Sequence, residues 1–309
     1  MKLKKLTIVG LVCLFIGLVL LIVGFAITGF DITKISTESK YQMKNFVSTN
    51  DVKEIIVEER NLLFEIRKST DDKVHFTYYE NDKEFYDIKQ SDDGILSIIK
   101  KDTRIWYDFI FNINFQTNKP IIYIPDDFSG DLSVEDSNSS IDISDITAGN
   151  ISLTTSNAKI IANDIVTSGK FEASSSNGTI VISKIKAEGD FICNTTSGKI
   201  DLKEIEADNF DLKTSNAIVI LNAIVSQNDI VIETSNAQVR FEDIDFGNRF
   251  RCRSSNGSIK GEIKGKLADY TIRSRTSNGN NNLPENSSGG AKTIDIETSN
   301  NSIEVNFIG

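Results

Sequence analysis

Apolar and polar residues alternate over most of the second half of the chain, and short polar interruptions recur at a nearly fixed interval. In residues 176–196, Ile180 and Ile182 follow one interruption, and Phe191 and Cys193 follow the next. Alternation with a period of two is typical of β-strands that bury one face. Each repeat therefore predicts two short strands, each with one set of side chains directed inward.

The interruptions carry a recurring Ser-Asn signal, which we interpret as a structural turn. Its central residues are Asn138, Asn157, Asn177, Ser197, Asn216, Asn236, Asn256, Asn278 and Asn300. Successive positions are 19, 20, 20, 19, 20, 20, 22 and 22 residues apart. A period near twenty residues in a β-rich sequence indicates a solenoid. We therefore expect an all-β fold, in which residues 129–309 form a β-solenoid (β-helix) that ends in a C-terminal cap.

Asparagine suits such a turn for two physical reasons. It tolerates left-handed backbone angles better than other residues with a side chain, and stacked amides can form a hydrogen-bonded ladder. Ala158, Ala217 and Ala237 follow three of the asparagines, so an unusual angle would belong to the asparagine or to no residue. A polar binding strip is the alternative function for this row.

The amino terminus has a different pattern. Lys2, Lys4 and Lys5 precede residues 6–30, which carry no charge. Such a run is long enough to cross a membrane. Its Ala26-Ile27-Thr28 is a poor match to the small-residue cleavage site of a signal peptide, so a cleaved signal peptide is the less favoured alternative. We expect residues 1–30 to be a single-pass membrane anchor with a short cytoplasmic end, since the lysines favour that orientation. Residues 31–45 then form a juxtamembrane linker, and the rest of the chain is extracytoplasmic.

Residues 46–128 are expected to form an irregular β region that starts the ectodomain. Strand-like segments lie at 52–57, 62–67, 74–79, 85–89 and 95–99. Their composition leaves open whether they form a separate domain. In residues 105–115 the odd positions are all apolar, which is typical of a long strand packed on the core. Trp106 also makes the second face partly apolar, so Trp106, Tyr107, Phe109 and Phe111 are a candidate contact surface.

Charge and cysteine content limit the possible partners and cross-links. Without the three amino-terminal lysines, residues 31–309 carry 31 basic and 44 acidic side chains, a net charge of −13. Such a domain repels nucleic acid. Cys193 and Cys252 occupy the same repeat position three turns apart, or about 14 Å at ordinary strand spacing. That separation is too large for a disulfide, so we expect two buried free thiols.

No motif of catalysis or cofactor binding is present. His75 is the only histidine, and no metal-ligand spacing, phosphate loop or nucleophile elbow occurs. Carboxylates such as Asp142, Asp164 and Glu204 recur at solvent positions, where a charged outer face is their usual role. We expect no cofactor, no metal site and no enzymatic activity, and keep a polysaccharide-active enzyme as the least favoured alternative.

The Ser-Asn-Gly-x-Ile-x-Ile repeats, the Ile-Tyr-Ile-Pro at 122–125 and the single amino-terminal anchor resemble the bacterial "putative adhesin" family of β-strand-repeat proteins. The resemblance covers about residues 46–309. It implies an envelope protein of the kind found in Gram-positive bacteria, and it transfers no catalytic residue.

Two hypotheses for function follow from the sequence. The first is a membrane-anchored, non-catalytic β-solenoid that serves as a binding, adhesion or envelope-sensing surface for a wall polymer or an envelope protein. The second is a structural strut of the cell envelope that assembles with copies of itself.

Overall fold

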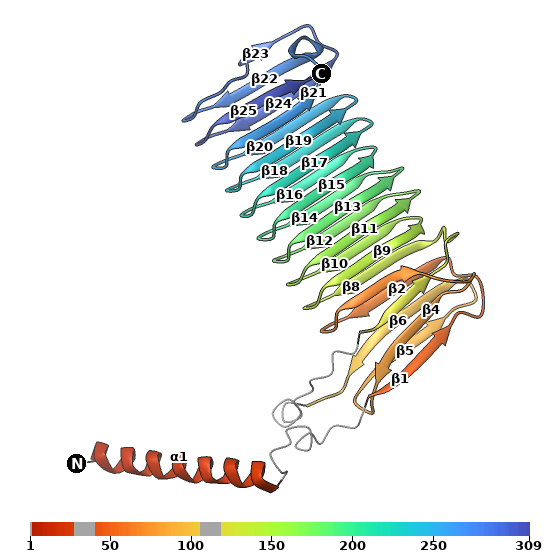
Figure 1. The fold of residues 1–309 in the computed structure, drawn as a ribbon, viewed down its shortest axis with the longest axis vertical. Helices are drawn as coiled ribbons and strands as arrows, with labels where there is room; N and C mark the ends of the chain where they lie inside the picture. The colour runs from red at the N-terminus through yellow and green to blue at the C-terminus, as the bar shows by residue number, and fades with distance from the viewer. Residues whose placement is uncertain (1, 28–40, 106–118) are drawn as a thin grey trace.

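The computed structural model describes residues 2–27, 41–105 and 119–309 (Figure 1). An amino-terminal helix, α1, spans Lys2–Ile27, and within it residues Thr7–Ile27 form a candidate membrane span with a mean hydropathy of 3.1. Within residues 41–105 and 119–309 the secondary structure consists of β-strands and one three-residue 3-10 turn, η2, at Leu267–Asp269. The all-β prediction is confirmed.

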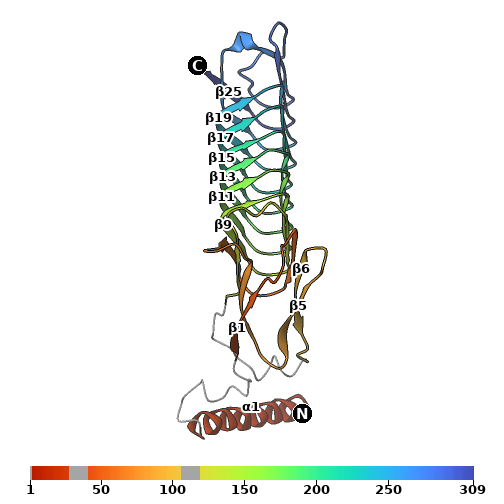
Figure 2. The same cartoon turned by 90° about the vertical axis from the view of Figure 1, so that its right-hand side faces the viewer.

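Two parallel sheets face each other along the whole solenoid (Figures 1 and 2). Each regular turn contributes one strand to each sheet, in the same register as its neighbours. Sheet A contains β9 (Ile141–Ala148), β11 (Ile160–Thr167), β13 (Ile180–Ala187), β15 (Ile200–Ala207), β17 (Val219–Ser226), β19 (Val239–Phe246) and β21 (Ile259–Lys264). Sheet B contains β8 (Asp131–Asp136), β10 (Ile151–Thr155), β12 (Phe171–Ser175), β14 (Phe191–Thr195), β16 (Phe210–Thr214), β18 (Asp229–Thr234) and β20 (Arg249–Ser254).

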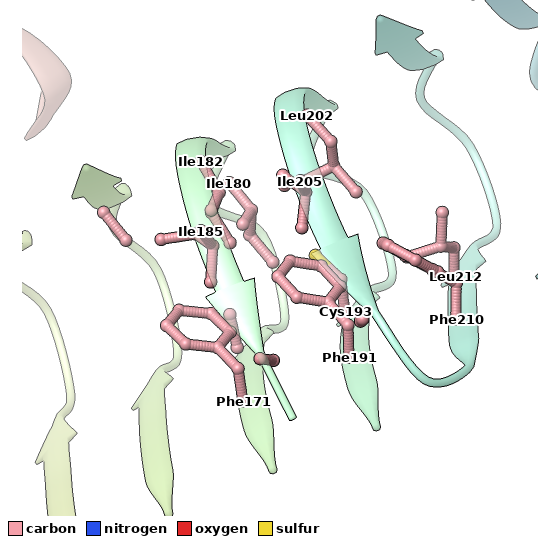
Figure 3. Packing of buried hydrophobic residues seen from close by; sticks show 14 of the residues in the cluster. Phe171, Ile180, Ile182, Ile185, Phe191, Cys193, Leu202, Ile205, Phe210 and Leu212 are labelled. Carbon is pink, nitrogen blue, oxygen red and sulfur yellow. The ribbon is translucent and has the colours of Figure 1, made fainter. Parts of the chain in front are cut away.

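Inward side chains of the two sheets form one continuous core, as Figure 3 shows for the middle turns. Phe171, Phe191 and Phe210 stack on one another, with ring centroids 5.2 and 5.3 Å apart. Their register partners Ile230 and Phe250 continue the same column. A single turn has no core of its own, so its stability depends on the turns above and below.

Both solenoid cysteines lie in this core and are free. The register runs from Cys193 through Leu212 and Ile232 to Cys252, three strands away. Burial raises the pKa of both thiols. The expected pair of buried, unlinked cysteines is confirmed.

The strands before residue 129 extend the same two sheets. They are β1 (Gln42–Val47), β2 (Glu54–Glu59), β3 (Phe64–Lys68), β4 (His75–Glu80), β5 (Glu84–Gln90), β6 (Ile95–Asp102) and β7 (Ile121–Ile124). β2 pairs in parallel with β8, and β3 with β9, so these two strands form the first rung of the solenoid. The parallel ladders therefore reach back to residue 54, before the boundary at 129 that the Ser-Asn signal suggested. β1 likewise begins at Gln42, inside the segment expected to be a linker.

The first rung lies between the second rung and a base formed mostly by later residues, together with the earlier strand β1. β6 and β7 pair with the outer edges of β2 and β3. Antiparallel strands then close the base, with β5 beside β6 and β4 and β1 beyond β7. We call β1 and β4–β7 the base cap. Its strands protect the edges of the parallel sheets, as solenoids require.

At the carboxyl-terminal end, residues that come earlier in the sequence cap the last turn. β22 (Tyr270–Thr276) and β23 (Asn286–Ser287) precede β24 (Lys292–Thr298) and β25 (Ile303–Ile308) in sequence. In sheet B, β24 lies between β20 and β22, so the irregular turn caps the last turn of the chain there, whereas β25 is the terminal strand of sheet A. Asn282 covers the edge of β25, because its amide both donates to and accepts from the Val305 backbone, at 3.0 and 2.9 Å.

Candidate binding surface

The asparagines of the Ser-Asn signal form an exposed column of amides. Nδ2 of each donates to Oδ1 of a neighbour along most of the column. Measured pairs are Asn157–Asn138 at 3.0 Å, Asn177–Asn157 at 2.9 Å, Asn236–Asn216 at 3.0 Å, Asn256–Asn236 at 2.7 Å, Asn300–Asn256 at 2.7 Å and Asn278–Asn300 at 2.8 Å. At Ser197 the side chain is too short, and Asn216 donates instead to the Thr196 carbonyl at 3.5 Å. The column also extends to Asn61 of the first rung, which accepts from Asn138 at 3.1 Å.

None of these asparagines has a positive φ angle. The first reason given above for asparagine, its tolerance of left-handed angles, therefore does not apply. The side-chain amide is what each of them contributes to the turn.

A second column lies directly inside the first and was missed by sequence reasoning. The residue two positions before each asparagine is Thr or Ser in the regular turns, and its hydroxyl is buried. The Ser175 hydroxyl accepts from the Gly178 N–H at 2.8 Å and donates to the Ala158 carbonyl of the preceding turn at 3.4 Å. Thr195 and Ser254 repeat this pattern. Each hydroxyl thus satisfies a buried backbone N–H and joins two successive turns.

A third column bends sheet A. Six residues that are not glycine have φ between 53° and 57°: Asp145, Asp164, Lys184, Glu204, Ala223 and Asp243. They occupy the same position in β9 through β19, where two consecutive side chains face outward before the inward alternation resumes. The sequence signal is a pair of outward residues between two apolar ones, as Ser183-Lys184 lies between Ile182 and Ile185.

The bend creates a groove that runs along the solenoid axis across six strands, β11 to β21. We call it the axial groove. Its volume is about 670 Å³, and its lining residues are Asp164, Ile165, Val166, Lys184, Ile185, Lys186, Glu204, Ile205, Glu206, Ala223, Val225, Asp243 and Lys264. Val166, on the outward face of β11, is 48% exposed. At the usual strand spacing the groove is about 24 Å long.

Charged side chains along the groove are largely paired with one another. Lys184 lies 3.5 Å from Asp164, and Lys264 lies 2.8 Å from Asp243. The hydrogen bond to Asp243 raises the pKa of Lys264. Lys186 and Glu206 are exposed, and in the strand register they lie between Val166 and Val225. The groove therefore combines apolar lining residues with nearly balanced charges, four carboxylates and three lysines, which suits a long uncharged or mixed-charge ligand better than a strongly ionic one.

The described residues contain no cluster of three or more His, Cys, Asp or Glu side chains that could hold a metal ion. His75 is partly exposed and its Nε2 contacts Asp71 Oδ1 at 2.7 Å, a surface pair four residues apart. The recurring carboxylates that the sequence placed on the solvent side lie there, and several of them line the axial groove. The aromatic contact surface, Trp106, Tyr107, Phe109 and Phe111, lies outside the described residues.

Comparison with known proteins gives one family match. The family model described as Toastrack DUF4097 matches residues 52–306. No curated protein matches the sequence of this chain.

Solved structures with a related arrangement include a "putative adhesin" from Parabacteroides distasonis ATCC 8503. It has 15% identity and a TM-score of 0.42, and the match covers 88% of this chain and 99% of that one. A "putative adhesin" from Parabacteroides merdae ATCC 43184 has 13% identity and a TM-score of 0.42, with coverages of 87% and 97%. These values are low, so the family assignment depends on the family model.

Proposed function

The chain belongs to the Toastrack DUF4097 family, and from that premise we propose that it is a membrane-anchored, extracytoplasmic binding protein of the cell envelope. The proposal includes no catalytic step. The observation that carries it is the axial groove, which crosses six strands of sheet A and has apolar lining residues on four of them, β11 to β17. A groove about 24 Å long with balanced charge fits one extended molecule better than a compact one.

The ligand that we propose is an extended polymer of the cell wall, bound along the groove for adhesion or for sensing the state of the envelope. Helix α1 would tether the protein, with Lys2, Lys4 and Lys5 on the cytoplasmic side. Its apolar segment Thr7–Ile27 supports this arrangement. We propose that the membrane anchor lies within residues 1–30 and that the linker after it ends before β1.

Assembly into an end-to-end strut is the less favoured proposal. The outer edge of β25 is occupied by Asn282, and the amino-terminal edges of β2 and β3 are covered by β6 and β7. Covered edges leave fewer backbone groups for pairing with a second molecule.

Co-sedimentation of the full chain in detergent micelles with insoluble cell-wall material from a Gram-positive bacterium tests the proposal. Val166→Lys together with Val225→Lys places two cations among the apolar lining residues, and we expect at least about a tenfold loss of affinity, or about 1.4 kcal/mol. Thr154→Lys on the outward face of β10, in the opposite sheet, is the matched control and should bind as the unaltered chain does. Equal binding by the groove variant and the control would refute the groove as the site.

Exposure of the ectodomain tests the orientation separately. Protease added to intact cells should remove residues 41–309 and leave α1 in the membrane. Protection of the ectodomain in intact cells, with cleavage only after lysis, would contradict the extracytoplasmic placement.

A further inference from the structure

The column of buried hydroxyls changes chemistry at its amino-terminal end. In register with Thr155 of β10 lies Asp136 of β8, and in register with Asp136 lies Glu59 of β2. Both carboxylates are directed inward, with Asp136 1% and Glu59 3% exposed. Neighbouring parallel strands are about 4.8 Å apart, so two acidic side chains lie next to each other where the regular turns have a hydroxyl.

The base cap surrounds this pair with further charged groups. From β5, the Tyr86 hydroxyl donates to Glu59 Oε2. From β6, Lys100 places its ammonium 4.4 Å from the centre of the Tyr86 ring. Glu84 of β5 pairs with Arg104 at 3.0 Å. Arg104 also pairs with Asp102, at the end of β6, at 2.6 Å.

Two atoms of the cluster have no hydrogen-bond partner among the residues that the structure describes. Asp136 Oδ1 accepts from the N–H groups of Asn138 and Ser139, at 2.8 and 2.7 Å, but its Oδ2 is buried without a partner. Lys100 Nζ is likewise buried without a hydrogen bond. A buried polar atom left unpaired is costly, and an unpaired carboxylate oxygen beside a second carboxylate is a natural place for a proton.

The charge balance points the same way. Within the described part of the chain, four carboxylates, those of Glu59, Glu84, Asp102 and Asp136, lie near two cations, those of Lys100 and Arg104. Burial, together with the nearby Glu59, raises the pKa of Asp136 to about 6, although its two backbone hydrogen bonds act in the opposite direction. Burial lowers the pKa of Lys100. A bound proton would reduce this excess of negative charge.

We propose that Asp136 and Glu59 form a proton-binding site that strengthens the contact between the first rung and the base cap at mildly acidic pH. The proton resides on Asp136 Oδ2 and is donated to a carboxylate oxygen of Glu59, so one hydrogen bond replaces one like-charge repulsion. The remaining charge of Glu59 is then matched by Lys100. Because the cap lies at the amino-terminal end of the solenoid, protons in the surroundings would control how firmly that end is held.

The sign of the effect follows from linkage. A carboxyl group whose pKa is higher in the folded protein than in the unfolded chain stabilises the fold below its unfolded pKa, and this contribution is lost as pH rises through its folded pKa. With values of about 6 and 3.8, the equilibrium for detaching the cap should become about tenfold less favourable between pH 7.5 and pH 5.

Hydrogen exchange of the full chain in detergent micelles, corrected for the intrinsic effect of pH, measures this directly. We expect protection of β5 and β6 to rise about tenfold from pH 7.5 to pH 5, while β14 and β15 change little. Asp136→Asn should abolish the rise, since it cannot take up the proton. Asp142→Asn, an outward carboxylate on β9, is the control and should leave the rise intact.

Asp136→Thr restores the residue type of the regular turns and provides a second variant in case the asparagine variant does not fold. In the unaltered chain, infrared spectra should show a buried protonated carboxylic acid that appears as the pH falls from 7.5 to 5 and is absent from whichever variant folds. A flat exchange profile in the unaltered chain, or a pH-dependent rise that persists in Asp136→Asn or Asp136→Thr, would overturn the proposal. Failure of the groove to bind a polymer would leave this proposal unaffected.

Discussion

Substitution of Ser175 by alanine tests which column holds the solenoid turns together. Ser175 is 7% exposed, and its hydroxyl accepts from the buried Gly178 N–H and donates to the Ala158 carbonyl. Alanine leaves that N–H without a partner in a dry environment. A buried unsatisfied donor costs about 1 to 3 kcal/mol, so we expect a loss of about 2 kcal/mol in the free energy of unfolding.

The exposed Asn177 provides the comparison. Its Nδ2 donates to Asn157 at 2.9 Å, but water can replace this contact. Asn177→Ala should therefore cost only about 0.5 kcal/mol, the lower end of the range for one hydrogen bond. The more conspicuous residue of the signal should be the less important one for stability.

Equilibrium urea unfolding of the full chain in detergent micelles, followed by circular dichroism, measures both losses. Ser174→Ala, the outward neighbour on β12, is the control and should lie within about 0.5 kcal/mol of the unaltered chain. Ser175→Thr keeps the hydroxyl and matches Thr195 of the next turn, so it should unfold nearly as the unaltered chain does. An equal or larger loss for Asn177→Ala than for Ser175→Ala would show that the amide column dominates and that our reasoning is wrong.

Three further changes test the core, the bend and the cysteines. Phe191→Ala removes the middle ring of the buried stack and should cost about 3 to 5 kcal/mol in the same urea assay; a cost below about 1 kcal/mol would contradict the packing described. Ala223→Gly removes a Cβ from a residue with a φ of 53°. It should raise the free energy of unfolding by about 0.5 to 1 kcal/mol, because the relief of left-handed strain exceeds the extra conformational entropy that glycine loses on folding. A lower free energy of unfolding would refute a strained bend. Cys193 and Cys252 should react with a thiol reagent only above the urea concentration at which the protein unfolds, since their thiols are buried; labelling of the folded protein would contradict their burial.

The amino-acid sequence alone was sufficient to predict the repeating architecture. Inward positions such as Ile180, Phe191 and Cys193 were correct because side chains alternate strictly along a strand, and a constant repeat length keeps each one in register with the next turn. The strands between residues 52 and 100 were also found, for the same reason, whereas β1 was not, because its residues were assigned to a linker. Their place in the fold was not, since pairing between distant strands leaves no local periodic signal.

The candidate binding surface was harder to predict from the sequence. The asparagines were conspicuous because they repeat, yet the buried hydroxyls two residues earlier repeat as well, and a small polar residue gives no sign of whether it is buried. The axial groove was missed because it depends on one backbone angle. Only three of the six bent positions hold aspartate, which tolerates positive φ, and the others hold Lys184, Glu204 and Ala223.

The sequence by itself thus determined the repeat, the inward and outward faces and the separation of the two cysteines, all of which follow from local alternation and repeat length. The tertiary structure alone decided that the first and last rungs lie inside their caps, that sheet A bends into a groove, and that Asp136 and Glu59 are neighbours. Strands β3 to β7 separate Glu59 from Asp136 along the chain. Such residues come together because the pairing of distant strands depends on which arrangement buries the most apolar surface over the whole molecule.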